Sequence, residues 1–236
     1  MSTGENTSER NGRSLLSDKR ILEHMDKGNV VIDPFKRENL GTASYDVSLG
    51  RFYYREQNPD IGRLIYSPWS EEDVRKVWGE SQTAATAGEY FHRIGHKLPE
   101  GINNDDEVIM IGPGETALCH TQEFLGGRNV VTTMMKARST VGRNFIEVCK
   151  CAGWGDVGYI NRWTMEVTNN SMQYIIPLVV GRRIAQLAFF EVGDTLGVDY
   201  SVKGKYQSTT DLKELQRLWR PDDMIPKMWK DREVEG

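Results

Sequence analysis

The segment 136–166 combines side chains that can bind phosphates and move protons. It begins with a turn in which Arg138 and Arg143 lie five positions apart around a glycine, with hydroxyls at Ser139 and Thr140. Guanidinium groups bind phosphate oxygens in a bidentate manner, and a glycine lets backbone amides approach an anion. The turn therefore predicts a site for a phosphorylated ligand, although an ordinary solvated turn would have the same residue types.

Two carboxylates follow in the same segment. Asp156 lies in a glycine-bounded turn, and Glu166 lies on an alternating strand that places Arg162 and Thr164 on the same polar face. A glutamate on such a face is usually only solvated, but a carboxylate in a partly enclosed pocket can act as a general base. These residues alone indicate a β-rich binder or hydrolase of a phosphorylated ligand.

Other catalytic chemistries lack their residue patterns. The zinc nucleobase deaminases need an H-x-E and a P-C-x-x-C pairing, and Cys149 and Cys151 have the wrong spacing for the latter. His92 and His96 lie four apart but lack the glutamate of H-E-x-x-H. There is also no G-x-S-x-G nucleophile elbow. We therefore expect neither zinc nor a covalent nucleophile.

Composition indicates a soluble globular protein. The chain has 236 residues, of which 38% are hydrophobic and 27% charged, and no apolar run approaches the length of a membrane span. The net charge of −4 argues against a broad nucleic-acid-binding surface. Three cysteines without a C-x-x-C pair favour a reducing compartment, so we expect a cytoplasmic protein that binds neither nucleic acid nor membrane.

Short alternating segments separated by turn residues predict a mainly β fold, an all-β sandwich or barrel with a few short helices. We expect a disordered tail at 1–14 and a single domain at 15–236, with an insert at 57–107 lying over the core and a carboxy-terminal clasp and helix at 200–236. Ser17 and Ser70 are expected helix caps. Expected strands cover 30–32, 43–50, 51–54, 108–111, 116–120, 130–135 after a turn at 126–127, 162–168, and a hairpin of 175–180 with 184–190.

Six short motifs in order resemble the dCTP deaminase branch of the dUTPase-like superfamily. The first motif consists of residues 16–18 together with 32–35 and resembles the amino-terminal helix and strand of the family. The second, residues 44–50, is similar to an S-x-D-x-x-L-G strand. Residues 138–143 resemble R-S-S-x-x-R, and 152–159 with 164–166 resemble A-G-x-x-D-P-G-[FYW] followed by T-L-E. Residues 181–187 resemble G-M-R-I-x-Q-L, and 205–207 match the K-Y-Q of a carboxy-terminal substrate clasp.

The resemblance implies a homotrimer with a distorted jelly-roll fold and three active sites at subunit interfaces. It implies metal-independent hydrolysis of the cytosine amino group of dCTP, giving dUTP and ammonia in the supply of dUMP and dTTP precursors. Mg²⁺ would bind through the substrate phosphates and not through protein side chains. The family also leads us to expect dTTP as an inhibitor.

The resemblance also implies roles for individual residues. Glu166 would be the general base, and Ser139 would help to hold the attacking water. Arg143 would be the third catalytic residue, and together with Arg138 it would bind the triphosphate. The remaining substrate-binding residues would be Thr140 in the arginine turn, Ala152 beside the base, Asp156 and Tyr159 at the deoxyribose, and Lys205, Tyr206 and Gln207 in the clasp.

Three positions depart from the family pattern. Val157 replaces a proline, Asn161 replaces a glycine, and Thr140 replaces a serine. Two other functions stay open from the sequence. A bifunctional relative would yield dUMP and pyrophosphate from dCTP, using Asp156 to activate water at the α-phosphate, and a non-catalytic nucleotide-binding regulator could share the fold.

Overall fold

The computed structural model describes residues 14–59, 62, 64–193, 195–197, 200, 204–207 and 209–234. The tail expected at 1–14 therefore lies outside the described residues except for Ser14. The helices are α1 (Asp18–Asp26), α2 (Glu71–Trp78), α3 (Ala87–Arg93), α4 (Ser139–Arg143) and α6 (Leu212–Leu218), with 3-10 turns η2 (Arg37–Asn39), η3 (Pro221–Met224) and η4 (Met228–Lys230).

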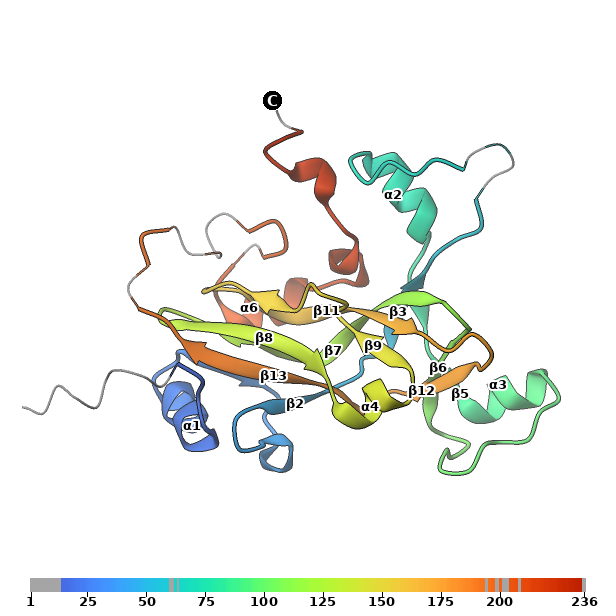
Figure 1. The fold of residues 1–236 in the computed structure, drawn as a ribbon, viewed down its shortest axis with the longest axis horizontal. Coiled ribbons are helices and arrows are strands. Elements are labelled where there is room, and N and C mark those ends of the chain that lie inside the picture. Colours follow the sequence, from blue (N-terminus) through green and yellow to red (C-terminus); the bar gives the residue numbers. More distant parts are fainter. Residues whose placement is uncertain are drawn as a thin grey trace, which may run out of the picture.

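The strands confirm a mainly β fold with a few short helices (Figure 1). They are β1 (Val30–Asp33), β2 (Tyr45–Ser48), β3 (Phe52–Arg55), β4 (Gln82–Thr83), β5 (Ala85–Thr86), β6 (Glu107–Ile111), β7 (Thr116–Gly127), β8 (Val131–Ala137), β9 (Ile146–Val148), β10 (Trp154–Gly155), β11 (Ile160–Asn169), β12 (Ile176–Val179) and β13 (Arg183–Glu191).

The helix starts follow from the caps expected from the sequence. The Ser17 hydroxyl accepts the Arg20 amide at 3.4 Å before α1, and the Ser70 hydroxyl accepts the Asp73 amide at 3.2 Å before α2. Each bond satisfies a backbone donor that the first helical turn leaves without a partner. Gly28, with φ +74°, ends the first helix in the left-handed conformation that glycine adopts without strain.

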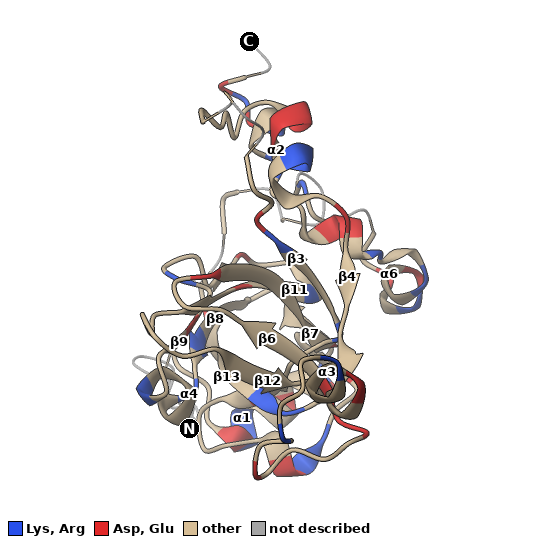
Figure 2. Cartoon of the chain, turned by 90° about the vertical axis from the view of Figure 1, so that its right-hand side faces the viewer, with Lys and Arg blue, Asp and Glu red and all other residues tan. Residues whose placement is uncertain are grey.

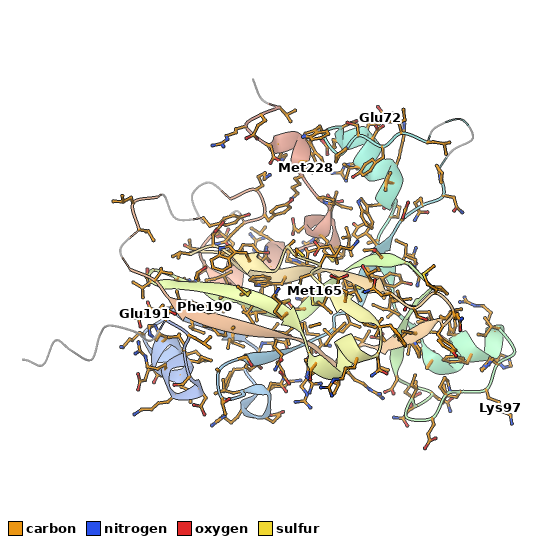
Figure 3. All side chains as sticks on the ribbon, viewed as in Figure 1. Glu72, Lys97, Met165, Phe190, Glu191 and Met228 are labelled. Carbon is orange, nitrogen blue, oxygen red and sulfur yellow. The ribbon has the colours of Figure 1, made fainter. Side chains whose placement is uncertain are left out.

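Three sheets organise the strands of the described residues. One has the order β4-β3-β7-β11-β9, with β1 also paired to β7; the second has the order β10-β8-β13-β2, and the third β12-β6-β5. The main core includes Trp163, Met165 and Val167 of β11, packed with Leu187 and Phe189 of β13. Figure 3 shows Met165 in the middle of this core.

The opposite face of β11 is covered by the end of the chain. Leu118, Phe124 and Ile160 on this face form a second apolar cluster with the carboxy-terminal residues Leu215, Trp219, Met224 and Ile225. Arg162, Thr164 and Glu166 share the face, as the alternation predicts, because Arg162 pairs with Phe124 and Glu166 with Leu118 across the antiparallel strands. The polar positions of this strand therefore lie under a packed layer.

Two turn predictions were wrong. Gly126 and Gly127 belong to β7 and pair with β1. Both positions require glycine because a side chain at either one would clash with neighbouring backbone: a Cβ on Gly126 would lie 1.9 Å from the Tyr159 carbonyl oxygen. Segments 175–180 and 184–190 do not form a hairpin. The strand β12 pairs with β6, whereas β13 pairs with β2 and β8, and Gly181 with φ +81° turns the chain between two sheets.

The two helices of segment 57–107 pack against two different parts of the molecule. Helix α2 lies beside the carboxy-terminal segment, where Arg75 pairs with Asp222 at 3.0 Å. Helix α3 lies at another end of the fold, where Phe91 packs with Val108 and Val179 in a small cluster of its own (Figure 1). Charged residues concentrate on helices and connecting loops, while the strands are largely uncharged (Figure 2).

Candidate functional site

A cavity of about 420 Å³ lies between β11 and the layer that covers it. Its polar lining includes Asp156, Tyr159, Thr164 and Glu166, and its volume is in the range of small-molecule sites. Five of the residues expected from the sequence thus meet in one place. These are Ala152, Asp156, Tyr159, Glu166 and Tyr206.

Glu166 is half-buried near the far end of β11. Burial raises the pKa of its carboxyl above the ordinary value, and the charge of Lys150 opposes that effect. A buried carboxylate with a raised pKa holds a proton more readily than a solvated one, which suits a group that accepts a proton from water and returns it. The position is fixed through the backbone, because the Glu166 carbonyl accepts the Cys149 amide at 3.0 Å.

The turn that carries Cys149 has an unusual backbone. Cys149 and Lys150 have φ of +63° and +43°, which is uncommon for residues with a Cβ. The turn is closed by the Ala152 amide, which donates to the Cys149 carbonyl at 2.7 Å. This geometry brings the backbone of Ala152 to the edge of the cavity that holds Glu166.

Asp156 and Tyr159 lie in the turn between β10 and β11. Asp156 is exposed at the mouth of the cavity, and its backbone carbonyl accepts the Tyr159 amide at 3.1 Å in a turn that includes Gly158 with φ +95°. The Tyr159 ring meets Trp163 and Tyr200 edge-to-face at 5.3 and 5.2 Å. Burial raises the pKa of the Tyr159 hydroxyl, so this group remains a neutral hydrogen-bond partner.

The expected clasp, residues 205–207, is docked against β11. The Gln207 side chain accepts the Ile160 amide at 2.8 Å and donates to the Gly158 carbonyl at 3.0 Å. Asn161, which departs from the family glycine, donates its side-chain amide to the Tyr206 carbonyl at 2.8 Å. This departure therefore adds a bond that holds the clasp.

The later carboxy-terminal segment holds the clasp from its other side. The Lys227 amide donates to the Tyr206 hydroxyl at 2.9 Å, and the Lys205 ammonium pairs with Asp231. Lys205 and Gln207 line a neighbouring hollow of about 140 Å³, and Tyr206 lines both this hollow and the main cavity.

The arginine turn lies elsewhere in the fold. Residues 139–143 form α4, which lies on the opposite side of the sheets from α2 and the carboxy-terminal segment (Figure 1). Arg138 pairs through Nε with the buried carboxylate of Asp46 at 3.1 Å, and Ser139 and Arg143 are exposed. Arg138, Ser139, Thr140 and Arg143 are therefore absent from the lining of the Glu166 cavity within one chain.

Arg162 also lies away from the cavity lining, although it shares the face of Glu166. Its guanidinium lies 5.0 Å from the ring centre of Phe124 and 4.7 Å from that of Trp219, an arrangement that cation–π attraction favours. Its Nε donates to the Gln122 carbonyl at 3.3 Å. These contacts indicate that Arg162 holds the covering layer.

Several residues that line the cavity were not predicted from the sequence as site residues. Leu118 lies directly opposite Glu166 across the strand pair, and Trp154 and Trp163 come from β10 and β11. Trp78, Tyr200, Met224 and Pro226 come from outside the sheets. A strand pattern can indicate that Leu118 is buried, but no local signal in the sequence shows which distant side chains cover the same face.

Neither a membrane span nor a protein metal cluster is found in the described parts of the chain. No helix there combines the length and apolar character needed to cross a bilayer. The same residues contain no group of three or more His, Cys, Asp or Glu side chains arranged to hold a metal ion.

Comparison with known proteins identifies relatives of the chain. A family model described as dCTP deaminase-like matches residues 15–192. A dUMP-forming dCTP deaminase from Methanobrevibacter smithii is 31% identical over 75% of this chain and 79% of its own. A protein of the same name from Methanococcus vannielii is 28% identical over 79% of this chain and 86% of its own.

The fold has a match among solved structures as well. The crystal structure of 2′-deoxycytidine 5′-triphosphate deaminase from Agrobacterium tumefaciens aligns with 75% of this chain at a TM-score of 0.51 and 15% identity. The aligned region spans about half of that protein, 49% of its chain. Fold and sequence thus agree with the order of motifs, and the chain belongs to the dCTP deaminase-like family.

Proposed function

We propose that the chain hydrolyses the amino group of dCTP, with Glu166 as the general base. The observation that carries the proposal is the half-buried position of Glu166 in a cavity it shares with Asp156, Tyr159 and Ala152. Glu166 accepts a proton from water as the water oxygen adds to C4 of cytosine, and passes this proton to N3. It then transfers the proton of the new C4 hydroxyl to the amino group, so that the C4–N bond breaks, ammonia leaves and the C4 carbonyl of uracil forms. General base catalysis of this kind contributes about 10²–10⁴ in rate.

The product we propose is dUMP with pyrophosphate, formed after deamination in the same site. The relatives reported above carry the name dUMP-forming, which supports this alternative over release of dUTP. The position of Asp156 in the Glu166 cavity is consistent with a second role for this carboxylate, activation of water at the α-phosphate. The substrate in this proposal is the Mg²⁺ complex of dCTP, with the ion held by the phosphates.

We further propose that a complete site needs a second copy of the chain, as the expected homotrimer provides. The separation of α4 from the cavity supports this, because the arginines and hydroxyls would then reach the phosphates and water of a neighbouring subunit. The surface next to α4 also supports it. Phe145, Met172, Tyr174 and Ile175 are between 52% and 82% exposed there, and the Phe145 carbonyl accepts the Asn170 amide at 2.8 Å. Exposed apolar groups of this kind mark interaction surfaces.

One assay separates the possible functions. The protein is incubated with dCTP and Mg²⁺, and ammonia, dUTP, dUMP and pyrophosphate are measured separately. We expect ammonia, dUMP and pyrophosphate in equal amounts. Ammonia with dUTP alone would limit the reaction to deamination, whereas pyrophosphate without ammonia would indicate a dUTPase. If the protein binds dCTP but forms no product, it would be a non-catalytic nucleotide-binding regulator. Glu166→Gln should retain dCTP binding and lose ammonia release, and retained turnover would remove Glu166 from its role.

Mixed oligomers test the shared site. Arg143→Ala and Glu166→Gln should each be inactive alone, because one lacks a phosphate contact and the other the base. Co-expression in equal amounts should restore roughly a quarter of wild-type activity, since random mixing leaves that fraction of interfaces with both residues intact. If both residues served a site within one chain, mixing would restore no activity. Inclusion of dTTP in the wild-type assay tests the expected inhibition, and cell fractionation tests the cytoplasmic location.

A further inference from the structure

The polar side chains on the cavity face of β11 differ in whether they have hydrogen-bond partners. In chain order they are Arg162, Thr164, Glu166 and Thr168. Arg162, at one end, donates through Nε to a carbonyl of β7 at 3.3 Å, and Thr168, at the other end, shares a hydrogen bond of 2.8 Å with the Thr116 hydroxyl. Thr164 and Glu166 lie between them and line the cavity. Neither of these two side chains makes a hydrogen bond with another residue that the structure describes.

The cross-strand neighbour of Thr164 cannot supply the missing partner. Thr164 lies opposite His120 in the register of β7 and β11, so the two side chains share a face. Burial lowers the pKa of His120 to about 4, so the ring is neutral and has one N–H. Its Nδ1 donates to the Thr121 carbonyl at 2.7 Å, and its Nε2 accepts the Phe52 amide at 3.2 Å. Because both ring nitrogens are in use, the Thr164 hydroxyl is available to a ligand of the cavity.

The spacing of Thr164 and Glu166 suits one small group held between them. Side chains two residues apart on a strand point to the same face, and their attachment points lie roughly 7 Å apart. A water molecule with two ordinary hydrogen bonds bridges oxygens up to roughly 5.5 Å apart. The glutamate side chain is long enough to close the difference. Strand geometry therefore allows a single water molecule to bond both side chains.

We propose that Thr164 is a catalytic residue, whose hydroxyl oxygen accepts a hydrogen bond from the water molecule that Glu166 deprotonates. This step rests on the proposed function, in which that water attacks C4 of cytosine. One proton of the water passes to Glu166 as the oxygen adds to C4. The other proton stays on the oxygen, bonded to Thr164, and becomes the proton of the C4 hydroxyl. With both hydrogens directed at the strand, a lone pair of the water oxygen is directed into the cavity, as the attack requires.

Thr164→Val is the direct test, because valine has the shape of threonine without the hydroxyl and is favoured in strands. The kcat for ammonia release from dCTP should fall about tenfold, the scale of one hydrogen bond made in the transition state. The Kd of dCTP, measured by calorimetry with and without Thr164→Val in a Glu166→Gln background, should change by less than twofold, since the hydroxyl contacts the water and not the nucleotide. Thr164→Ser keeps a hydroxyl and should retain most of the wild-type kcat. Thr164→Ala provides the same test if Thr164→Val does not fold.

Thr168→Val is the matched control, because it makes the same chemical change on the same face of the same strand. The Thr168 hydroxyl is bonded to Thr116, and Thr168 does not line the cavity. This control should lower Tm and leave kcat at its wild-type value. Thr164→Val breaks no hydrogen bond between described residues, so it should keep the wild-type Tm and lose activity. The pair of variants thus separates a catalytic hydroxyl from one that only stabilises the strand.

The outcomes also separate this proposal from the proposed function. If the wild-type protein releases ammonia and Thr164→Val does so within twofold of the same rate, only the role of Thr164 is wrong. A loss confined to the Kd of dCTP would overturn that role as well, because the hydroxyl would then contact the nucleotide. The same holds if Thr164→Ser is as slow as Thr164→Val, or if Thr168→Val loses as much kcat. If the wild-type protein releases no ammonia from dCTP, the proposed function fails and the catalytic role of Thr164 fails with it.

Discussion

Replacement of Gln207 by alanine should loosen the backbone on both sides of Tyr159. The Gln207 side chain, 7% exposed, links the Ile160 amide at 2.8 Å with the Gly158 carbonyl at 3.0 Å. Alanine removes both bonds and leaves two buried backbone groups without partners, each at a cost of about 1–3 kcal/mol. With partial relief from entering water, we expect a local loss of about 2 kcal/mol.

The loss should remain local because other contacts hold the clasp. Asn161 and Lys227 still bond Tyr206. Hydrogen exchange of the Ile160 amide, measured by NMR, is the direct assay, and 2 kcal/mol corresponds to exchange that is about thirtyfold faster. The dCTP KM should rise as well, since Tyr159 lines the cavity.

Gln207→Glu separates the two bonds. A carboxylate still accepts the Ile160 amide but cannot donate to the Gly158 carbonyl, so this variant should have faster exchange than the wild type and slower exchange than Gln207→Ala. Unchanged exchange of the Ile160 amide in Gln207→Ala would refute the reasoning, because it would mean that the side chain does not protect this amide in solution.

Three further outcomes follow from the site and its cover. Burial raises the pKa of Glu166 above its ordinary value of 4.5, so in a kcat–pH profile the loss of deamination toward acid pH should have its midpoint above pH 4.5. Glu166→Gln should also raise Tm at pH 8, because the buried charge of Glu166 opposes folding there. This gain in Tm should vanish as the pH falls to about 4.5 and the carboxyl becomes protonated in both the folded and the unfolded state. Gly155→Ala should cost about 1–3 kcal/mol in denaturant unfolding, because its Cβ would lie 2.4 Å from the Thr133 hydroxyl, whereas Gly193→Ala meets nothing within 4 Å and should be neutral. Arg75→Ala should cost less than about 1 kcal/mol, since this ion pair is about half exposed, and a larger loss would show that it holds α2 in place.

Local patterns were sufficient for many elements of the fold. Ser17 and Ser70 start helices because each hydroxyl satisfies a backbone donor only a few residues away. Alternation placed Met165 in the core and Glu166 on the opposite face of β11, because side chains on a strand alternate between its faces. These predictions depend on short-range geometry, which the sequence displays directly.

The wrong predictions all involve neighbours far along the chain. Gly126 was assigned to a turn from its type, but it is needed in a strand where the Tyr159 carbonyl comes close. The hairpin about Gly181 failed because β12 finds its partner in β6, well upstream. For the site, the fold places α4 and Glu166 on different sides of one chain, so the phosphate-binding roles expected for Arg138 and Arg143 remain predictions that depend on a second copy of the chain.

The cover over β11 connects these findings. A strand face that carries Arg162, Thr164 and Glu166 would remain solvated on an open sheet, and a solvated carboxyl would keep an ordinary pKa. Trp219 and Met224 cover this face through the second apolar cluster, and Arg162 tolerates the cover by stacking on aromatic rings. Because burial is the main cause of the raised Glu166 pKa, the proton chemistry proposed for β11 depends on enclosure of this face. The carboxy-terminal segment, which contributes Met224 and Pro226 to the lining of the cavity, therefore supplies part of the environment of the general base.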